Sequence, residues 1–185
     1  MKNRKELAQH FAKLGFKLGV EVGVCRGYYS KTLCESIPGL KLYGVDNWST
    51  KASSHTERNV DDEAYKDALA TLKPFIDSGV YTIIRKTSME ALADFEDESL
   101  DFVYLDAGHT YEEVREDVRG WAPKVRMGGI LSGHDYYEFK SGKGGIIPAV
   151  DEYAGEFDVN LQLTDWDKEN PERDERQPSW FFVKE

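Results

Sequence analysis

The chain has 185 residues, a formal net charge of −10 at pH 7, 40% hydrophobic residues and 31% charged residues. This length and composition predict one globular domain that spans residues 1–185. A strongly acidic surface disfavours non-specific binding to nucleic acid and to anionic membranes. No apolar run approaches the ~18 residues that a membrane-spanning helix needs, and the first residues carry no apolar signal segment. The two cysteines, Cys25 and Cys34, suit neither a disulfide scaffold nor a zinc site, so we expect a cytoplasmic protein.

The first half of the chain is predicted to alternate strands with helices. Leu7, Phe11 and Leu14 recur at helical spacing, so residues 1–17 are expected to hold a lead-in helix that Gly15 ends. The elements expected after it are a strand at Leu18–Val24, a helix from Gly27 to about Pro38, a strand at Lys41–Val45, a helix along Tyr65–Ile76, a strand at Tyr81–Arg85, and a short helix at Ser88–Asp94 with Ser88 as its N-cap.

The second half continues this alternation. Thr110 and Glu113 form a capping-box pattern ahead of a helical stripe that extends from Tyr111 to Val125. The other expected elements are strands at Asp101–Leu105, Ile130–Ser132, Leu161–Thr164 and Ser179–Val183, a turn at Gly128–Gly129, and a helix from Pro148 to about Ala154. Repeated alternation of strand and helix predicts an α/β fold, with a parallel sheet covered by helices on both faces.

Ligands of such a sheet bind outside the carboxyl ends of its strands, so the residues at these ends matter most. Gly23 and Gly27 follow the first strand and allow a tight turn close to a ligand. Asp46 ends the second strand, where a carboxylate can hold the hydroxyls of a ribose. The glycines alone also fit an ordinary turn, but together with Asp46 they favour a nucleoside-type ligand.

The first turn differs from the dinucleotide fingerprint. That fingerprint needs a central glycine to let a pyrophosphate approach, and the chain has Cys25 there. Glu21 adds a carboxylate that would repel pyrophosphate and would suit the cationic end of a methionine moiety. Trp48, beside Asp46, is expected either to border an adenosine pocket or to anchor the segment that follows.

The E-x-G-x-x-x-G pattern at Glu21–Gly27, together with Asp46, resembles the class I S-adenosylmethionine-dependent methyltransferases. The D-x-x-H-x-Y pattern at Asp106–Tyr111 and the G-H-D-Y pattern at Gly133–Tyr136 resemble, more narrowly, the macrolide-sugar O-methyltransferase group. The resemblance implies S-adenosyl-L-methionine as cofactor and a Rossmann-like, seven-stranded, mostly parallel sheet whose last strand is antiparallel. The residues it assigns to the cofactor are Gly23 and Gly27 at the methionine part, Glu21 near its amino end, Asp46 at the ribose, Ser88 and Met89 at the adenine, and also Asn47, Trp48 and Asp106.

A second group of residues could carry the chemistry. Asp106 and Asp135 end neighbouring strands, and paired carboxylates there suit a divalent cation such as Mg²⁺ that orients a hydroxylated acceptor. His109 follows Asp106 by about one helical turn and is the expected general base, with Asp106 as a second catalytic residue. Asp106 could instead only cap the next helix, and His134 could be a packed strand-end histidine.

The metal prediction depends on His134. Catechol-type relatives carry Asp-Asn after the fifth strand, whereas this chain has Asp135-Tyr136, which removes one ligand unless His134 replaces it. An imidazole ligand would favour a softer ion than Mg²⁺. The predicted metal ligands are therefore Asp106, His134 and Asp135.

The leading hypothesis is methyl transfer to an oxygen of a small hydroxylated molecule, such as a sugar or a natural product, with assistance from a divalent metal. An NAD-dependent oxidoreductase and a non-catalytic nucleoside-binding domain are the alternatives. Nucleic acid and membrane partners are not expected, and an oligomer is compatible with the sequence. Acceptor specificity is expected in the loops at Asn47–Asp62, which is polar and a candidate lid, Tyr136–Ile147 and Asp165–Gln177.

Overall fold

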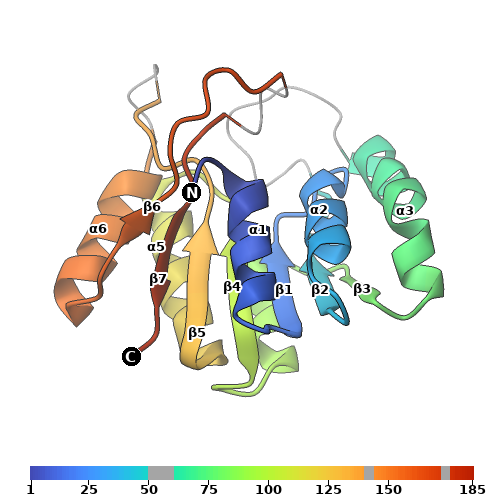
Figure 1. The fold of residues 1–185 in the computed structure, drawn as a ribbon, viewed down its shortest axis with the longest axis horizontal. Helices are drawn as coiled ribbons and strands as arrows, with labels where there is room; N and C mark the ends of the chain where they lie inside the picture. The colour runs from blue at the N-terminus through green and yellow to red at the C-terminus, as the bar shows by residue number, and fades with distance from the viewer. Residues whose placement is uncertain (50–60, 140–143, 172–175) are drawn as a thin grey trace.

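The computed structural model describes residues 1–49, 61–139, 144–171 and 176–185. Their strands form one seven-stranded sheet with the order β3-β2-β1-β4-β5-β7-β6 (Figure 1). Neighbours are parallel from β3 to β5, whereas β7 is antiparallel to both β5 and β6. This confirms the Rossmann-like, mostly parallel sheet with an antiparallel last strand. The strands are β1 (Leu18–Val22), β2 (Lys41–Val45), β3 (Tyr81–Ile84), β4 (Leu100–Leu105), β5 (Val125–Gly133), β6 (Gln162–Leu163) and β7 (Trp180–Val183).

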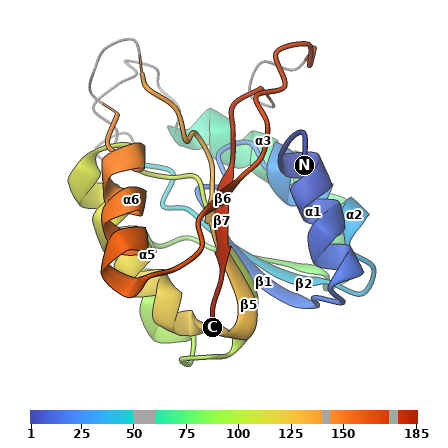
Figure 2. The ribbon, with the colours of Figure 1, turned by 60° about the vertical axis from the view of Figure 1, so that its left-hand side comes forward.

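Helices cover both faces of the sheet. Figure 2 shows the sheet nearly edge-on, with α1, α2 and α3 on one side and α5 and α6 on the other. The helices are α1 (Arg4–Lys13), α2 (Tyr28–Ser36), α3 (Asp61–Asp77), α4 (Ser88–Ala91), α5 (Tyr111–Trp121) and α6 (Ile146–Phe157), with 3-10 turns at Leu92–Asp94 and Ala122–Lys124. None of the helices in the described ranges is long and apolar enough to cross a membrane.

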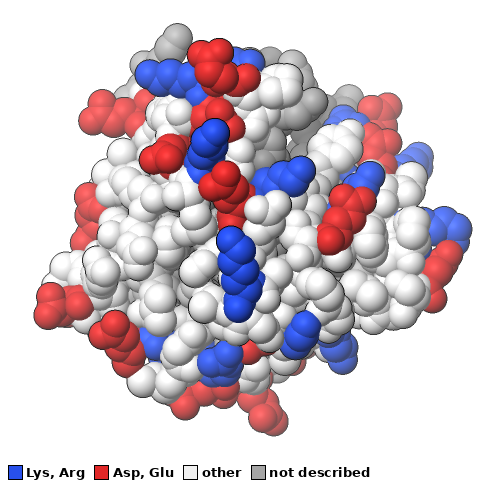
Figure 3. All heavy atoms as spheres, in the orientation of Figure 1, with Lys and Arg blue, Asp and Glu red and all other residues white. Residues whose placement is uncertain are grey.

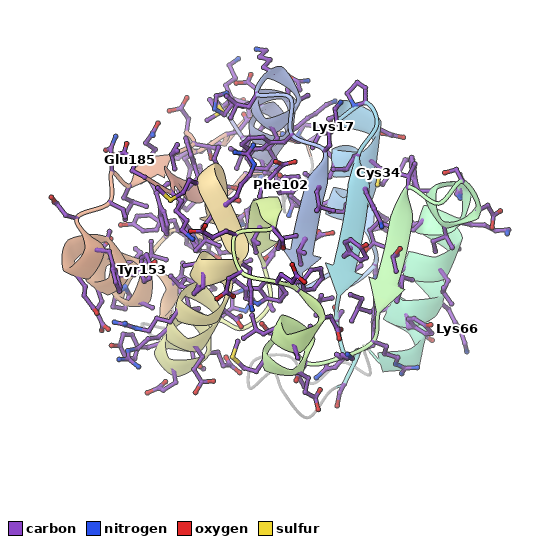
Figure 4. The ribbon with its side chains drawn as sticks, turned by 90° about the horizontal axis from the view of Figure 1, so that it is seen from below. Lys17, Cys34, Lys66, Phe102, Tyr153 and Glu185 are labelled. Atoms are coloured by element: carbon purple, nitrogen blue, oxygen red, sulfur yellow. The ribbon has the colours of Figure 1, made fainter. Side chains whose placement is uncertain are left out.

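Two hydrophobic clusters, one on each face, hold the layers together. Alternate residues of β1 face opposite layers, so Val20 and Val22 pack under α5 and α6 while Glu21 faces α2. On the other face Phe102, in the middle of the sheet (Figure 4), stacks on Phe11 of α1 with ring centroids 4.5 Å apart. The lead-in helix is thus part of the core.

Several predicted boundaries were wrong for local reasons. The first strand ends at Val22, before Gly23, whose φ of 93° leaves the extended region. Thr87, not Ser88, is the N-cap of α4, because its hydroxyl accepts the N–H of Glu90 in a reciprocal capping box. The helix predicted to reach Val125 ends at Trp121, and Val125 begins β5. The capping box of Thr110 and Glu113 at the start of α5 is confirmed.

The candidate lid at residues 47–62 is described only at its ends. Asn47, Trp48 and Ser49 follow β2, and α3 begins at Asp61. Residues 50–60 lie outside the described residues, as do parts of the two other predicted specificity loops, at 140–143 and 172–175.

Candidate active site

The candidate site lies at the carboxyl ends of β1, β2, β4 and β5, the upper edge of the sheet in Figure 1. The chain runs outward from β1 to β3 and then returns to add β4 on the other side of β1. In open α/β sheets, ligands bind at such a reversal, between the loops that follow the two central strands, here the residues after Val22 and after Leu105. We call this the β1/β4 crevice.

The loop from β1 to α2 needs its glycines for backbone geometry. Gly23 has φ 93°, and a Cβ there would come within 2.1 Å of the carbonyl oxygen of Asp106. Gly27 is the N-cap of α2 with φ 78°, and as a glycine it provides no side-chain hydrogen bond to the first-turn N–H groups of this helix. These donors suit a negatively charged ligand group, because the N-terminus of a helix carries partial positive charge.

Asp46 organises the same loop. Its Oδ2 accepts the backbone N–H groups of Val24 (3.0 Å) and Cys25 (2.9 Å), and its Oδ1 accepts that of Trp48 (2.7 Å). A carboxylate offers about four lone-pair sites, so capacity for a ligand hydroxyl remains. The side chain of Asn47 accepts the N–H of Ser49 at 3.0 Å.

Trp48 is buried and has φ 45°. Its indole N–H donates to the carbonyl of Cys25 at 2.8 Å, and its ring lies 4.8 Å from that of Tyr65 on α3. These contacts tie the end of β2 to the β1–α2 loop and to α3.

Glu21 does not carry the charge that the sequence argument assumed. Its carboxyl group is buried on the α2 side, where the hydroxyl of Ser30 donates to it and in turn lies 3.1 Å from the Tyr81 hydroxyl. Burial raises the pKa of Glu21 to about 8, more than the Ser30 hydrogen bond lowers it. At neutral pH this side chain is mainly a neutral acid and does not attract a cationic group as a carboxylate would.

Ser88 and Met89 lie at the start of α4. The Ser88 hydroxyl donates to Asp117 of α5 and accepts the indole N–H of Trp121 at 2.9 Å, so it joins α4 to α5. Burial raises the pKa of Asp117 to about 6. Met89 is 37% exposed, which leaves it the more accessible of the two predicted adenine neighbours.

The structure brings Asp106, His134 and Asp135 together. One ligand atom from each lies within 4.8 Å of the other two. His134 Nδ1 is 3.2 Å from Asp135 Oδ1 and 3.7 Å from Asp106 Oδ2. Among the residues that the structure describes, the other ring nitrogen, Nε2, is buried without a hydrogen-bond partner.

His109 joins this cluster through Asp135. Its Nε2 lies 3.1 Å from Asp135 Oδ2, and this hydrogen bond raises the pKa of the imidazole against the opposing effect of burial. Burial by itself would raise the pKa of Asp135. The hydrogen bond from His109 and the nearby imidazoles outweigh this effect, so the pKa of Asp135 is lowered. Burial raises the pKa of Asp106 despite His134 nearby.

Two carboxylates and an imidazole nitrogen that can converge are a donor set suited to a divalent ion. Oxygen-only sites favour Mg²⁺ and Ca²⁺, whereas a mixed set of oxygen and imidazole suits Mn²⁺, Fe²⁺ or Zn²⁺ better. The side chains of Asp106, His134 and Asp135 therefore fit a transition metal more closely than they fit Mg²⁺.

Sequence reasoning missed Arg4. This residue of α1 is 7% exposed, and its Nη1 lies 3.2 Å from Asp106 Oδ2. The available signal was its spacing, since Arg4 precedes Leu7 by three positions and Phe11 by seven and so lies on the apolar face of the helix.

A row of aromatic rings leads outward from His109, and sequence reasoning missed it as well. Phe139 lies edge-on to His109 at 5.7 Å and stacks on Tyr137 at 4.5 Å, and Trp166 lies edge-on to Tyr137 at 5.3 Å. The rings come from the loop after β5 and the loop after β6, two segments that are distant in sequence. We call these three residues the aromatic row.

Comparisons with known proteins identify the family. Residues 20–136, more than half of the chain, match the model of a family described as a methyltransferase domain. An uncharacterized protein of Sinorhizobium fredii, y4gI, is 28% identical over 120 residues, which are 63% of this chain and 13% of y4gI.

Solved structures show the same fold. The O-methyltransferase TomG of Streptomyces achromogenes, involved in tomaymycin synthesis and solved in complex with S-adenosylmethionine, has a TM-score of 0.67 and 15% identity, with 98% of this chain and 80% of TomG covered. A putative rRNA-methylase of Clostridium thermocellum has a TM-score of 0.66 and 14% identity, with 100% and 99% covered. The chain belongs to this family of methyltransferase domains and has the class I methyltransferase fold of these solved structures, which confirms the broader resemblance of its sequence motifs.

Proposed function

We propose that the protein transfers a methyl group from S-adenosylmethionine to a hydroxyl oxygen of a small molecule, with His109 as the general base. The observation that carries this proposal is the hydrogen bond between His109 and Asp135 beside the β1/β4 crevice. When bound, S-adenosylmethionine supplies a methyl carbon activated by a positive sulfur. The protein's part is to align the acceptor and to remove its proton.

The hydrogen bond assigns the roles of the two imidazole nitrogens. Nε2–H donates to the Asp135 carboxylate, which leaves the lone pair of His109 on Nδ1. Nδ1 accepts the acceptor's hydroxyl proton as the new oxygen–carbon bond forms and the carbon–sulfur bond breaks. Asp135 holds the ring in position and stabilises the imidazolium that results.

The cofactor would lie across the crevice. We assign its ribose to Asp46 and Asn47, its adenine to the side of Trp48, Ser88 and Met89, and its methionine part to the loop at Gly23 and Gly27. Asp106 would lie near the reacting centre. Because the acid Glu21 is buried behind this loop, its role is to support α2 through Ser30.

Asp106, His134 and Asp135 would hold a divalent cation in this site. Such an ion would supply Lewis-acid chemistry that orients the acceptor hydroxyl and lowers its pKa, while His109 would still remove the proton. The three-residue donor set supports this assignment.

The aromatic row supports an acceptor with a ring. The flat faces of these aromatic side chains, beside the base His109, would stack on a ring of the acceptor and present one of its hydroxyl groups to the base. Glu138 and Asp165 flank the row in sequence, and the net charge of the chain is −10, so the acceptor is expected to be uncharged or cationic. On the face drawn in Figure 3, basic and acidic side chains are interspersed, which does not favour a polyanion such as RNA.

Calorimetric titration with S-adenosylhomocysteine and, separately, with NAD tests the cofactor. Binding of S-adenosylhomocysteine alone is expected, and Asp46→Asn should weaken it by about 10-fold or more, because hydrogen bonds to a charged group are lost. Ser49→Ala, an exposed neighbour, is the matched control. Binding of NAD without S-adenosylhomocysteine would overturn the proposal. A panel of catechols and methyl glycosides, assayed with S-adenosylmethionine, then separates aromatic from sugar acceptors.

A further inference from the structure

The loop that follows β6 is bound to the first residues of the chain on both sides of Trp166. The N–H of Asp165 donates to the carbonyl of Met1 at 2.7 Å. The side-chain amide of Asn3 donates from Nδ2 to Asp167 Oδ2 at 2.9 Å. In Figure 1 the N-terminus lies beside this loop. Because both neighbours of Trp166 are held in this way, these contacts fix the backbone that carries its indole.

Asn3 joins the loop to a rigid part of the core. Its Oδ1 accepts the N–H of Glu6 at 3.2 Å, so the same side chain caps α1 and holds Asp167. Leu7 and Phe11 bury the helix completely on its inner face. Among the side chains that cap helices well, an aspartate has no N–H to donate and a serine ends one bond earlier. An asparagine at this position therefore does two tasks at once.

The loop presents Trp166 at the outer end of the aromatic row that begins beside His109. The indole lies edge-on to Tyr137, with ring centroids 5.3 Å apart, and it is 44% exposed. The other three tryptophans are buried: Trp48, Trp121 and Trp180. An exposed indole that continues a row of rings offers apolar area to a ligand with a ring of its own.

We infer that Asn3 is a positioning residue for the methyl acceptor, an inference that rests on the proposed function. Through Asp167 it holds Trp166 as the outer wall of the acceptor site. The next residue, Arg4, pairs with Asp106 at 3.2 Å. The start of α1 is thus bonded both to the loop that carries this wall and to the sheet edge where the methyl group is transferred.

A change at Asn3 that keeps the helix cap isolates this role. Asn3→Ser retains an oxygen that caps α1 but is too short to reach Asp167. In assays with catechols and methyl glycosides, KM for the acceptor should rise about 3- to 10-fold, because part of a charge-assisted hydrogen bond is lost from acceptor binding. Both kcat and the affinity for S-adenosylhomocysteine should change less than about twofold, since His109 and the β1/β4 crevice are unaltered.

Collisional quenching by acrylamide gives a second readout, which needs no turnover. Trp166 is the exposed one of the four tryptophans, so acrylamide quenches mainly its fluorescence. An acceptor that stacks on the indole should protect it from acrylamide in the unaltered protein. Asn3→Ser should need about 3- to 10-fold more acceptor for the same protection.

Gln9→Ser is the matched control, because it removes an exposed amide from the same helix. Asp167→Ala removes the other partner, so the double variant with Asn3→Ser should raise KM no more than the larger single change. Additive changes would overturn the inference. An unchanged KM would also overturn it, as would an equal loss of S-adenosylhomocysteine affinity, and Asn3 would then be a helix cap alone.

The two readouts separate this inference from the proposed function. If the unaltered protein binds the acceptors but transfers no methyl group, the proposed function fails, and protection of Trp166 from acrylamide still decides the role of Asn3. Protection of Trp166 by none of the acceptors would overturn the inference even where turnover is normal.

Discussion

The guanidinium of Arg4, near the start of the chain, and the carboxylate of Asp106, at the end of β4, form an ion pair of 3.2 Å across the sheet edge. Their side chains are 8% and 20% exposed, so water screens the pair only weakly. Asp106→Asn should lower the free energy of unfolding by roughly 2–4 kcal/mol, because it leaves a buried cation without this counter-charge. Urea unfolding measures the change.

A double-mutant cycle separates this pair from other effects. Arg4→Met combined with Asp106→Asn should be less destabilising than the sum of the two single variants, because once one member of the ion pair is gone, removing the other no longer breaks that pair. Additive changes would show that the two groups do not interact in solution.

His109→Gln should lower turnover by about 10²- to 10⁴-fold while S-adenosylhomocysteine affinity stays within about twofold, because the base acts on the acceptor and not on the cofactor. Single-turnover assays with an acceptor from the panel give the rate. His10→Gln, on α1, is the control and should be fully active. A His109→Gln enzyme that keeps normal turnover would remove His109 from the mechanism.

One Mn²⁺ per chain should bind to Asp106, His134 and Asp135 with higher affinity than Mg²⁺, because an imidazole favours the transition metal. Titration calorimetry on protein treated with EDTA measures both. His134→Ala should weaken Mn²⁺ binding by about 10-fold or more. The exposed carboxylate Asp97, changed to Asn, is the control. Equal binding of Mn²⁺ by His134→Ala and the unaltered protein would exclude the imidazole as a ligand.

Glu21 makes stability depend on pH. Its pKa of about 8 in the folded protein, against 4.5 as the ordinary value, means that the unfolded chain releases this proton first. Between about pH 5 and pH 8 the folded state binds more protons, so the contribution of Glu21 to the free energy of unfolding falls as pH rises. Glu21→Gln should therefore match the unaltered protein near pH 5 and exceed it at pH 8 and above.

Each pKa unit corresponds to about 1.4 kcal/mol, so the expected gain is at most several kcal/mol. Denaturant unfolding at a series of pH values measures it. Glu35→Gln, which removes an exposed carboxylate of α2, is the control. A constant offset between Glu21→Gln and the unaltered protein at all pH values would mean that Glu21 is ionised in the fold.

The sequence predicted the sheet and the cluster at its edge for one geometrical reason. Carboxyl ends of parallel strands meet at one edge, so the strand-end residues Asp106, His134 and Asp135 had to approach one another. Runs of apolar and β-branched residues located the strands that the structure describes, although boundaries shifted where a side chain decided them. Thr87 and Ser88 are both good N-caps, and only the folded chain shows which hydroxyl reaches Glu90.

The features that sequence reasoning missed depend on packing between distant segments. Arg4 reaches Asp106 only because α1 lies over the middle of the sheet. Burial under α2 raises the pKa of Glu21, and a strand pattern does not reveal that burial. The aromatic row joins two loops about 30 residues apart in sequence, and no local periodicity connects such segments.

The three backbone N–H groups bound by Asp46 have a thermodynamic consequence for ligand association. The turn after β1 is already ordered when the chain folds. The loss of conformational entropy on ordering this turn therefore does not reduce the free energy of cofactor binding. A preorganised turn should show little change in amide hydrogen exchange on addition of S-adenosylhomocysteine. For the same reason, a change at Asp46 affects two equilibria, folding and binding, and its effect on affinity is interpretable only beside its effect on stability.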